Sequence, residues 1–367
     1  MDHEPDPKLH PYRDKKSCRI IGLFLGKITQ IKTHPYYTGQ VSGGVVTVCL
    51  VKAFFKNELT RLFLFVVLCL ILAAIFTPYV YAWGKEFSSG DTGDGIMGSI
   101  KKSMARADLA RYFNRALMGV AIILLYPFIR TLKSDNNRVD IKSPLSTRIN
   151  PRFQGWKDMF MGFIYAMGYM CIFIMVVYKL GWVKLDADAS IGKTLTKAIA
   201  PAVGASLVEE WLFRGVLFGL LLRSLSTRAT IIGLSFFFAL VHFLEPYEGS
   251  PDIVDGGASD AGFQLLAQIG ERFLHPEDFI GIFLTLFVVG VVLAYARAKT
   301  GYLWMSIGLH AGWVFTLRMF NGLTDNTGIA NPVLYGENIR EGLFPLLIVC
   351  LTGVAVWFYL RPKKSLL

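Results

Sequence analysis

Two adjacent carboxylates and an arginine interrupt an apolar stretch of the sequence. Glu209, Glu210 and Arg214 lie in a run that otherwise reads as a membrane-spanning helix. An ionisable residue at the centre of a bilayer costs about 3 kcal/mol on insertion scales, so such residues are paired, face a wet cavity or carry out chemistry. On a helix Glu210 and Arg214 share a face and can form an ion pair, whereas Glu209 is rotated by about 100°. Glu209 is therefore the carboxylate that has no local partner.

Two histidines lie in other apolar segments. His242, with Phe238 four residues before it, ends one segment, and His310 lies near the middle of another. Two histidines and a free carboxylate can bind a divalent metal ion, or they can polarise a water molecule directly. In the second case Glu209 is the general base, His242 orients the water, and the remaining histidine donates a hydrogen bond to the oxyanion of an attacked carbonyl.

The order and spacing of these residues resemble the motifs of the CPBP family, the CAAX prenyl endopeptidase and bacteriocin-processing family of glutamate-dependent intramembrane proteases. The resemblance covers about 195–320 and rests on three motifs in successive helices. They are Glu209–Glu210–x–x–x–Arg214, Phe238–x–x–x–His242, and His310 within Gly–Leu–His–Ala–Gly–Trp. Any one of these motifs alone is a weak signal, whereas the ordered set is specific.

The resemblance implies a role for each motif residue. It implies that Glu209 and His242 activate the water and that His310 helps to form the oxyanion hole. It also implies that Glu210 and Arg214 hold the helix, in agreement with the ion pair derived from their spacing. We expect Phe238 to line the cavity rather than to take part in the chemistry.

One position departs from the family pattern. The family usually has Asn four residues after the third-motif histidine, as a second oxyanion donor, and this sequence has Val314 there. Valine cannot donate a hydrogen bond, and losing one such donor costs about 2.7–4 kcal/mol in the transition state. Trp313, on a neighbouring face of the helix, has an indole N–H that could replace the missing donor.

The composition is that of a polytopic membrane protein. Of the 367 residues 53% are hydrophobic and 28 are Phe, and the mean hydropathy is +0.45. The formal net charge of +11 arises from Lys and Arg gathered between apolar segments, which indicates membrane topology and contact with anionic lipid rather than a nucleic-acid partner. The five cysteines show no CxxC spacing, so neither a disulfide framework nor a zinc ribbon is indicated.

Eight apolar segments are long enough to be membrane-spanning helices. They are 62–83, 107–129, 159–178, 195–222, 229–244, 279–298, 302–320 and 343–360. The sequence therefore predicts an all-α fold, a bundle of about eight transmembrane helices. Residues 84–105 read as a Gly, Asp and Ser loop, and 262–274 as a short surface helix.

The same segments divide the chain into four regions. We expect a cytoplasmic arm at 1–61, N-terminal transmembrane helices at 62–194, a catalytic core at 195–320, and a final helix with a basic tail at 321–367. The core contains an acidic insert at 245–278. With eight spans the basic loops all fall on one side and the insert on the other, so we expect a multi-pass protein of a bacterial plasma membrane with both termini in the cytoplasm.

The leading hypothesis is an intramembrane endopeptidase without a cofactor, whose partners are the bilayer and a membrane-embedded or lipid-anchored peptide or protein. A zinc enzyme with Glu209, His242 and His310 as ligands is the alternative mechanism. A second class is a non-proteolytic carrier or scaffold that retains the fold, because transporters also place carboxylates and histidines near the midplane. Val314 is the feature that favours this second class.

Overall fold

The computed structural model describes most of the chain after residue 57. The described residues are 58–90, 96–133, 153–244, 253, 255–275, 279–331, 333–335 and 342–361. Nearly all of the predicted arm 1–61, much of the linker 130–157 and part of the insert 245–278 lie outside them. The chain divides into Met1–Leu64 and Phe65–Leu367, and the described residues lie almost wholly in the second unit.

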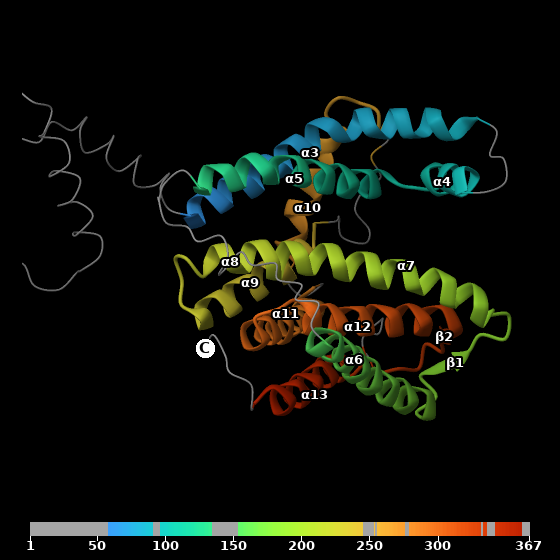
Figure 1. Ribbon diagram of the computed structural model, residues 1–367. Coiled ribbons are helices and arrows are strands. Elements are labelled where there is room, and N and C mark those ends of the chain that lie inside the picture. The colour runs from blue at the N-terminus through green and yellow to red at the C-terminus, as the bar shows by residue number, and fades with distance from the viewer. Residues whose placement is uncertain are drawn as a thin grey trace, which may run out of the picture. The chain divides into compact units, whose positions relative to one another are not determined.

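The described part of this unit is built almost wholly from helices (Figure 1). The long helices are α3 (Glu58–Ser89), α5 (Leu109–Lys133), α6 (Phe153–Lys179), α7 (Ile191–Glu210), α9 (Thr227–Val241), α11 (Ile280–Thr300), α12 (Trp304–Leu323) and α13 (Leu343–Leu360). The short ones are α4 (Ile96–Ala105), the π-helix η1 (Trp211–Leu217), α8 (Phe218–Leu221) and α10 (Ala261–Arg272). Two short strands, β1 (Val183–Leu185) and β2 (Thr324–Asn326), pair antiparallel.

The predicted all-α membrane fold is confirmed. Each of the eight predicted segments coincides with a helix, and the segment 195–222 is formed by α7, η1 and α8 in succession. Among the described helices, five are long and apolar enough to cross a membrane, namely α3, α5, α6, α11 and α13, and α9 is apolar but shorter. The chain is thus an integral membrane protein, while the number of eight crossings stays a prediction.

One of the two predictions about the connecting segments was wrong. The predicted loop 84–105 contains the end of α3 and the helix α4. The predicted surface helix is confirmed as α10: one of its faces is exposed, and on the other Leu265 and Ile269 pack against Ala73 and Ala74 of α3. Gly262 lies so close to α3 that a Cβ there would overlap the carbonyl of Ala74. This face of α10 is buried because it packs closely on α3, a contact that the local sequence does not indicate.

The core of the region that holds the motifs is formed by α6, α11, α12 and α13, which lie side by side (Figure 1). Large apolar side chains from these four helices form one cluster, among them Phe173, Leu293, Leu309, Trp313 and Val356. Glycine lets α12 approach α6 closely, because a Cβ on Gly308 would overlap the carbonyl of Met159. Small residues at such contacts are a common means of packing helices in membranes.

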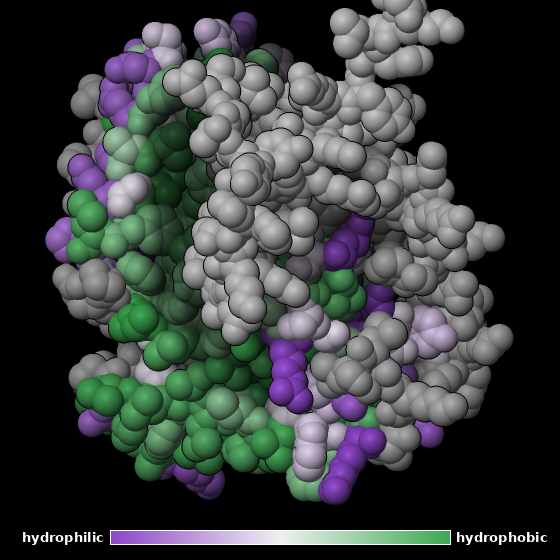
Figure 2. Space-filling view, turned by 90° about the vertical axis from the view of Figure 1, so that its left-hand side faces the viewer, coloured by the Kyte–Doolittle hydropathy of each residue, from purple (hydrophilic) through white to green (hydrophobic). Residues whose placement is uncertain are grey.

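The outward surface of these helices is apolar. Figure 2 shows hydrophobic residues covering much of the described part of one face, with hydrophilic residues toward its borders. Exposed large hydrophobic side chains occur on every long helix except α12, for example Ile199 on α7 and Phe358 on α13, at 48% and 60% exposure. Such a surface is expected where lipid takes the place of water.

Candidate active site

The buried face of α7 delivers one of the two carboxylates to the interior. Residues four apart share a face of a helix, and on α7 the buried residues follow this spacing: Thr194, Ala198, Ala202, Ser206 and Glu210. The first four are small, so α7 packs directly against α12. Glu210 ends this row and is completely buried. Glu209 lies one residue away from the row and keeps 31% of its side chain exposed.

The helix changes register directly after the two carboxylates. Residues Trp211–Leu217 form the π-helix η1, in which the N–H of Phe218 donates to the carbonyl of Phe213, five residues earlier. Single π-helical turns within α-helices occur frequently at functional sites. Every residue from Phe213 to Leu221 is buried, so this irregular backbone lies within the protein rather than in lipid.

The Glu210 carboxylate has two charged or ionisable partners. Its Oε1 accepts a hydrogen bond from Arg214 Nη1 at 2.9 Å, which is the ion pair expected from the sequence. The same oxygen lies 3.0 Å from His310 Nδ1 on α12. Glu210 and Arg214 are both fully buried, and 8% of the His310 side chain is exposed. The pair therefore neutralises both buried charges and also ties α7 to α12.

Phe238 contributes to the site through both its ring and its backbone. Its ring lies 4.3 Å from the Arg214 guanidinium carbon, a cation–π contact. Its carbonyl oxygen lies 2.7 Å from His242 Nδ1. Phe238 is thus more than a lining residue, because it covers the buried arginine and orients the imidazole that ends α9.

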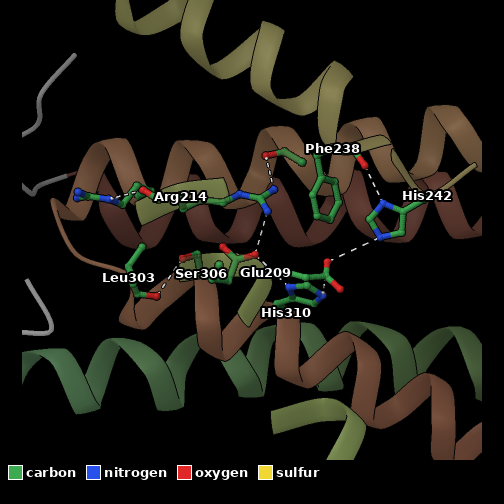
Figure 3. Close-up of polar contacts among 10 residues, drawn as sticks. Glu209, Arg214, Phe238, His242, Leu303, Ser306 and His310 are labelled. Carbon is green, nitrogen blue, oxygen red and sulfur yellow. Dashed lines mark hydrogen bonds and ion pairs between the residues drawn. The ribbon is translucent and has the colours of Figure 1, made fainter. Parts of the chain in front are cut away.

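Glu209 faces both histidines. Its Oε2 lies 3.8 Å from His242 Nε2 and 3.9 Å from His310 Nε2, and Figure 3 shows the carboxylate between the two rings. These distances are too long for direct hydrogen bonds. Oε2 is buried and has no hydrogen-bond partner among the residues that the structure describes. Separations of this size between polar groups are typical of groups that one water molecule bridges.

The contacts of the Nδ1 atoms determine which nitrogens can accept. A carbonyl or carboxylate oxygen only accepts hydrogen bonds, so Nδ1 of His242 and Nδ1 of His310 each carry the proton. In the neutral rings both Nε2 atoms are then acceptors, like Glu209 Oε2. Three acceptors therefore converge on one place, and the group that fits between them must donate hydrogen bonds or carry positive charge.

The structure also brings in residues that the sequence analysis did not select. Arg297 of α11 is 2% exposed, and its Nε donates to the carbonyl of Arg214 at 3.1 Å. Arg214 Nη2 in turn donates to the carbonyl of Gly290, also on α11, at 3.4 Å. In the sequence Arg297 lies at the end of the predicted segment 279–298, where nothing local gives it a role. A helical projection of α11 would have shown it on the same face as Gly290, seven residues away.

Two positions bear on the second oxyanion donor: Val314, where the family usually has Asn, and Trp313, the suggested replacement donor. The Trp313 ring belongs to the core cluster of α6, α11, α12 and α13 and is 7% exposed. Its indole nitrogen Nε1 is buried and has no hydrogen-bond partner among the described residues. A buried donor without a partner is costly and asks for an explanation. Val314 is partly buried and offers no donor.

Within the described residues, no group of three or more His, Cys, Asp and Glu side chains is arranged as a metal cluster. The three converging acceptors Glu209, His242 and His310 are nevertheless chemically suited to zinc, which prefers neutral imidazole and carboxylate ligands. Their buried contacts to Phe238 and Glu210 are also of the kind that orients metal-bound histidines. Metal dependence is therefore a matter for experiment.

Comparison with known proteins gives one match. The family model described as type II CAAX prenyl endopeptidase Rce1-like matches residues 192–316, which include every motif residue discussed above. Comparison with curated proteins gives no match, and comparison with solved structures gives none. The matched segment, in which the three motifs meet at one site, is thus similar to type II CAAX prenyl endopeptidase Rce1-like domains, and this match supports the resemblance to the CPBP family.

Proposed function

We propose that the chain is an intramembrane endopeptidase that hydrolyses a peptide bond with a water molecule activated by Glu209. The observation that carries this proposal is the position of Glu209 Oε2 between the Nε2 atoms of His242 and His310, at 3.8 and 3.9 Å. A water molecule held between Glu209 and His242 donates one proton to Glu209. The second hydrogen points to His242, which orients the water for attack.

The remaining steps use His310 and Glu209. As the hydroxide attacks the carbonyl carbon, the imidazolium form of His310, which already carries a proton on each nitrogen, donates a hydrogen bond from Nε2 to the developing oxyanion and keeps that proton. The Glu210 carboxylate, 3.0 Å from His310 Nδ1, holds the ring in the orientation that directs Nε2 toward this oxyanion. Glu209 then returns its proton to the leaving amine.

The surroundings of Glu209 support a membrane-associated substrate. Its neighbours Leu207, Val208 and Trp211 expose 45%, 46% and 42% of their surface, so the carboxylate borders an apolar outer face. A substrate held in the bilayer or anchored by a lipid can reach such a site from the side. The match to a type II CAAX prenyl endopeptidase model makes a prenylated C-terminal CAAX peptide the first substrate class to test.

A zinc-dependent form of the same reaction is the second candidate, because three converging acceptors also suit a cation. Glu209, His242 and His310 would hold the ion, which supplies a bound water of lowered pKa when present. The two forms assign different roles to Glu209. In the metal-free form it is the base, whereas in the zinc form it is a ligand.

The test compares the purified wild-type protein with Glu209→Gln in nanodiscs, on a fluorogenic farnesylated CAAX peptide and on its unprenylated twin. We expect wild type to cleave the farnesylated peptide and Glu209→Gln to be slower by about 10²–10⁴-fold in kcat, the usual contribution of a general base. Glu271→Gln, at an exposed site on α10, is the matched control and keeps wild-type activity.

Two outcomes would contradict the proposal. If Glu209→Gln cleaves as fast as wild type, Glu209 is not the base. If the wild-type protein cleaves neither peptide nor any other membrane-anchored peptide, the carrier or scaffold alternative replaces the protease. Cleavage of the unprenylated twin at the same rate would keep the protease and remove the prenyl group from its recognition.

A further inference from the structure

The π-helix η1 takes away the usual hydrogen-bond partner of one carbonyl group. In an α-helix the N–H of Phe218 would donate to the carbonyl of Arg214, four residues earlier. Here this N–H donates to the carbonyl of Phe213, five residues earlier. The Arg214 carbonyl is buried, and a buried carbonyl needs a donor. It receives one from the side chain of Arg297, whose Nε lies 3.1 Å away.

A second contact runs between the same two elements in the opposite direction. Arg214 Nη2 donates to the Gly290 carbonyl of α11 at 3.4 Å. The same guanidinium forms the ion pair with Glu210 of α7 and the cation–π contact with Phe238 of α9. Gly290 and Arg297 lie seven residues apart and share a face of α11. Each of the two elements thus holds the backbone of the other through an arginine.

The burial of Arg297 sets it apart from the other basic residues near the ends of the spans. Lys and Arg that set membrane topology keep their charged groups in water or among lipid headgroups. Arg297 is only 2% exposed, and its donor is directed at the backbone of η1. Lys299, two residues later on the same helix, is partly exposed. The side chain of Arg297 therefore has a hydrogen-bonding role inside the protein.

We propose that Arg297 is a positioning residue that holds η1 in its π-helical register. Through η1 it keeps Arg214 against Glu210, and so keeps the end of α7 with Glu209 in place. Arg297 touches none of the reacting atoms. Its effect on catalysis rests on the proposed protease function, whereas its effect on the backbone of η1 can be measured without any substrate.

The test uses two substitutions of nearly equal shape. In Arg297→Gln the side-chain amide nitrogen occupies the position of the arginine Nε and retains a donor. In Arg297→Met a methyl group occupies that position and no donor remains. Both variants lose the charge, so a difference between them reports on the hydrogen bond alone. Lys299→Met is the matched control for loss of a charge and a donor elsewhere on α11.

The first measurement is hydrogen exchange of the peptide 211–222 in nanodiscs, with the peptide 343–360 as internal reference. We expect exchange in Arg297→Met to be about tenfold faster than in wild type, the effect of losing one buried hydrogen bond. Arg297→Gln and Lys299→Met exchange like wild type. Equal exchange in Arg297→Met and wild type, or equal acceleration in Met and Gln variants, would overturn the proposal.

The second measurement is cleavage of the farnesylated CAAX peptide. We expect Arg297→Met to lower kcat by about 10²-fold, because small misplacement of catalytic groups has effects of this size, with KM unchanged and Arg297→Gln restoring the rate. If wild type cleaves no peptide, the proposed function fails while the exchange data still decide the role of Arg297. If Arg297→Met does not fold, slower thermal inactivation of Arg297→Gln than of Arg297→Ala supports the proposal, and equal inactivation contradicts it.

Discussion

Glu210 and His310, 100 residues apart in the chain, meet at 3.0 Å through Oε1 and Nδ1. The same oxygen accepts from Arg214 at 2.9 Å. This carboxylate therefore does two things at once. It neutralises a buried guanidinium, and it fixes the proton of His310 on Nδ1, which leaves Nε2 to face Glu209. In the proposed reaction the second glutamate of the motif thus positions His310, in addition to its part in the helix packing.

Removing the charge of Glu210 should destabilise the fold strongly. We expect Glu210→Gln to lower the free energy of unfolding by about 3–5 kcal/mol, because it leaves Arg214 as an uncompensated buried charge. Arg214→Met should have a similar effect. The double variant should lose less than the sum of the two, by about 0.5–3 kcal/mol, as expected for residues in direct contact. Unfolding titrations in mixed micelles measure all three, with Glu271→Gln as control, and additive losses would contradict the coupling.

Chelation decides between the two proposed forms of the reaction. We expect peptidase activity to survive prolonged treatment with 1,10-phenanthroline and EDTA, since Glu209 as general base needs no ion. Elemental analysis of the purified protein should find less than stoichiometric zinc. Loss of activity on chelation, followed by recovery on adding zinc alone, would instead assign Glu209, His242 and His310 as ligands.

The indole N–H of Trp313 can be removed while the ring size is largely kept. We expect Trp313→Phe to lower kcat by about 10²–10³-fold with little change in KM, the usual effect of losing one oxyanion donor. Steady-state kinetics on the farnesylated peptide measure this. Trp182→Phe, which changes another aromatic residue packed against the same cluster, is the control. Equal activity of Trp313→Phe and wild type would reduce Trp313 to a packing residue.

Introducing a hydrogen-bond donor at Val314 complements the removal of the donor of Trp313. If Trp313 already supplies the second donor, Val314→Asn alone should stay within about threefold of wild type in kcat, whereas the same change should raise the rate of Trp313→Phe by at least about tenfold. Val314→Ala in the Trp313→Phe background should give no such rescue. An increase on introducing Asn into the wild-type protein would show that the oxyanion hole lacks a donor.

The contact between α12 and α6 should tolerate no side chain at one position. In Gly308→Ala the new Cβ meets the carbonyl of Met159, a backbone atom that cannot rotate away. We expect a loss of about 1–3 kcal/mol in unfolding free energy, typical of overpacking, together with lower activity because His310 lies half a turn further on. Gly168→Ala on α6, where nothing lies within 4 Å, is the control, and equal stability of the two variants would contradict this expectation.

The sequence predicted the positions of the helices and the identity of the polar residues that meet. Apolar segments of sufficient length indicated the helices, and charges within them were costly enough to single out Glu209, Glu210 and Arg214. Those predictions needed only residue types and helical spacing. Where the termini lie relative to the membrane stays a prediction.

Other features depend on contacts between distant segments. The spacing of Glu210 and Arg214 suits an ordinary helix, so nothing local indicated the π-helix that begins at Trp211. From the sequence alone, either Glu209 or Glu210 could be the partner of His310 Nδ1. The packing of α7 on α12 determines that the partner is Glu210. Arg297 resembled any basic residue at the end of a span, because its contact to Arg214 joins residues 83 positions apart.

The small-residue face of α7 also bears on how the protein is assembled. Each charge on this helix opposes its entry into lipid by about 2.5–3.5 kcal/mol, and Ala198, Ala202 and Ser206 bring little apolar area to offset it. Gly290 and His310, which contact Arg214 of η1 and Glu210 of α7, are synthesised 76 and 100 residues after those partners. The segment that carries Glu209 and Glu210 is therefore stably accommodated in the bilayer only once α11 and α12 have been synthesised.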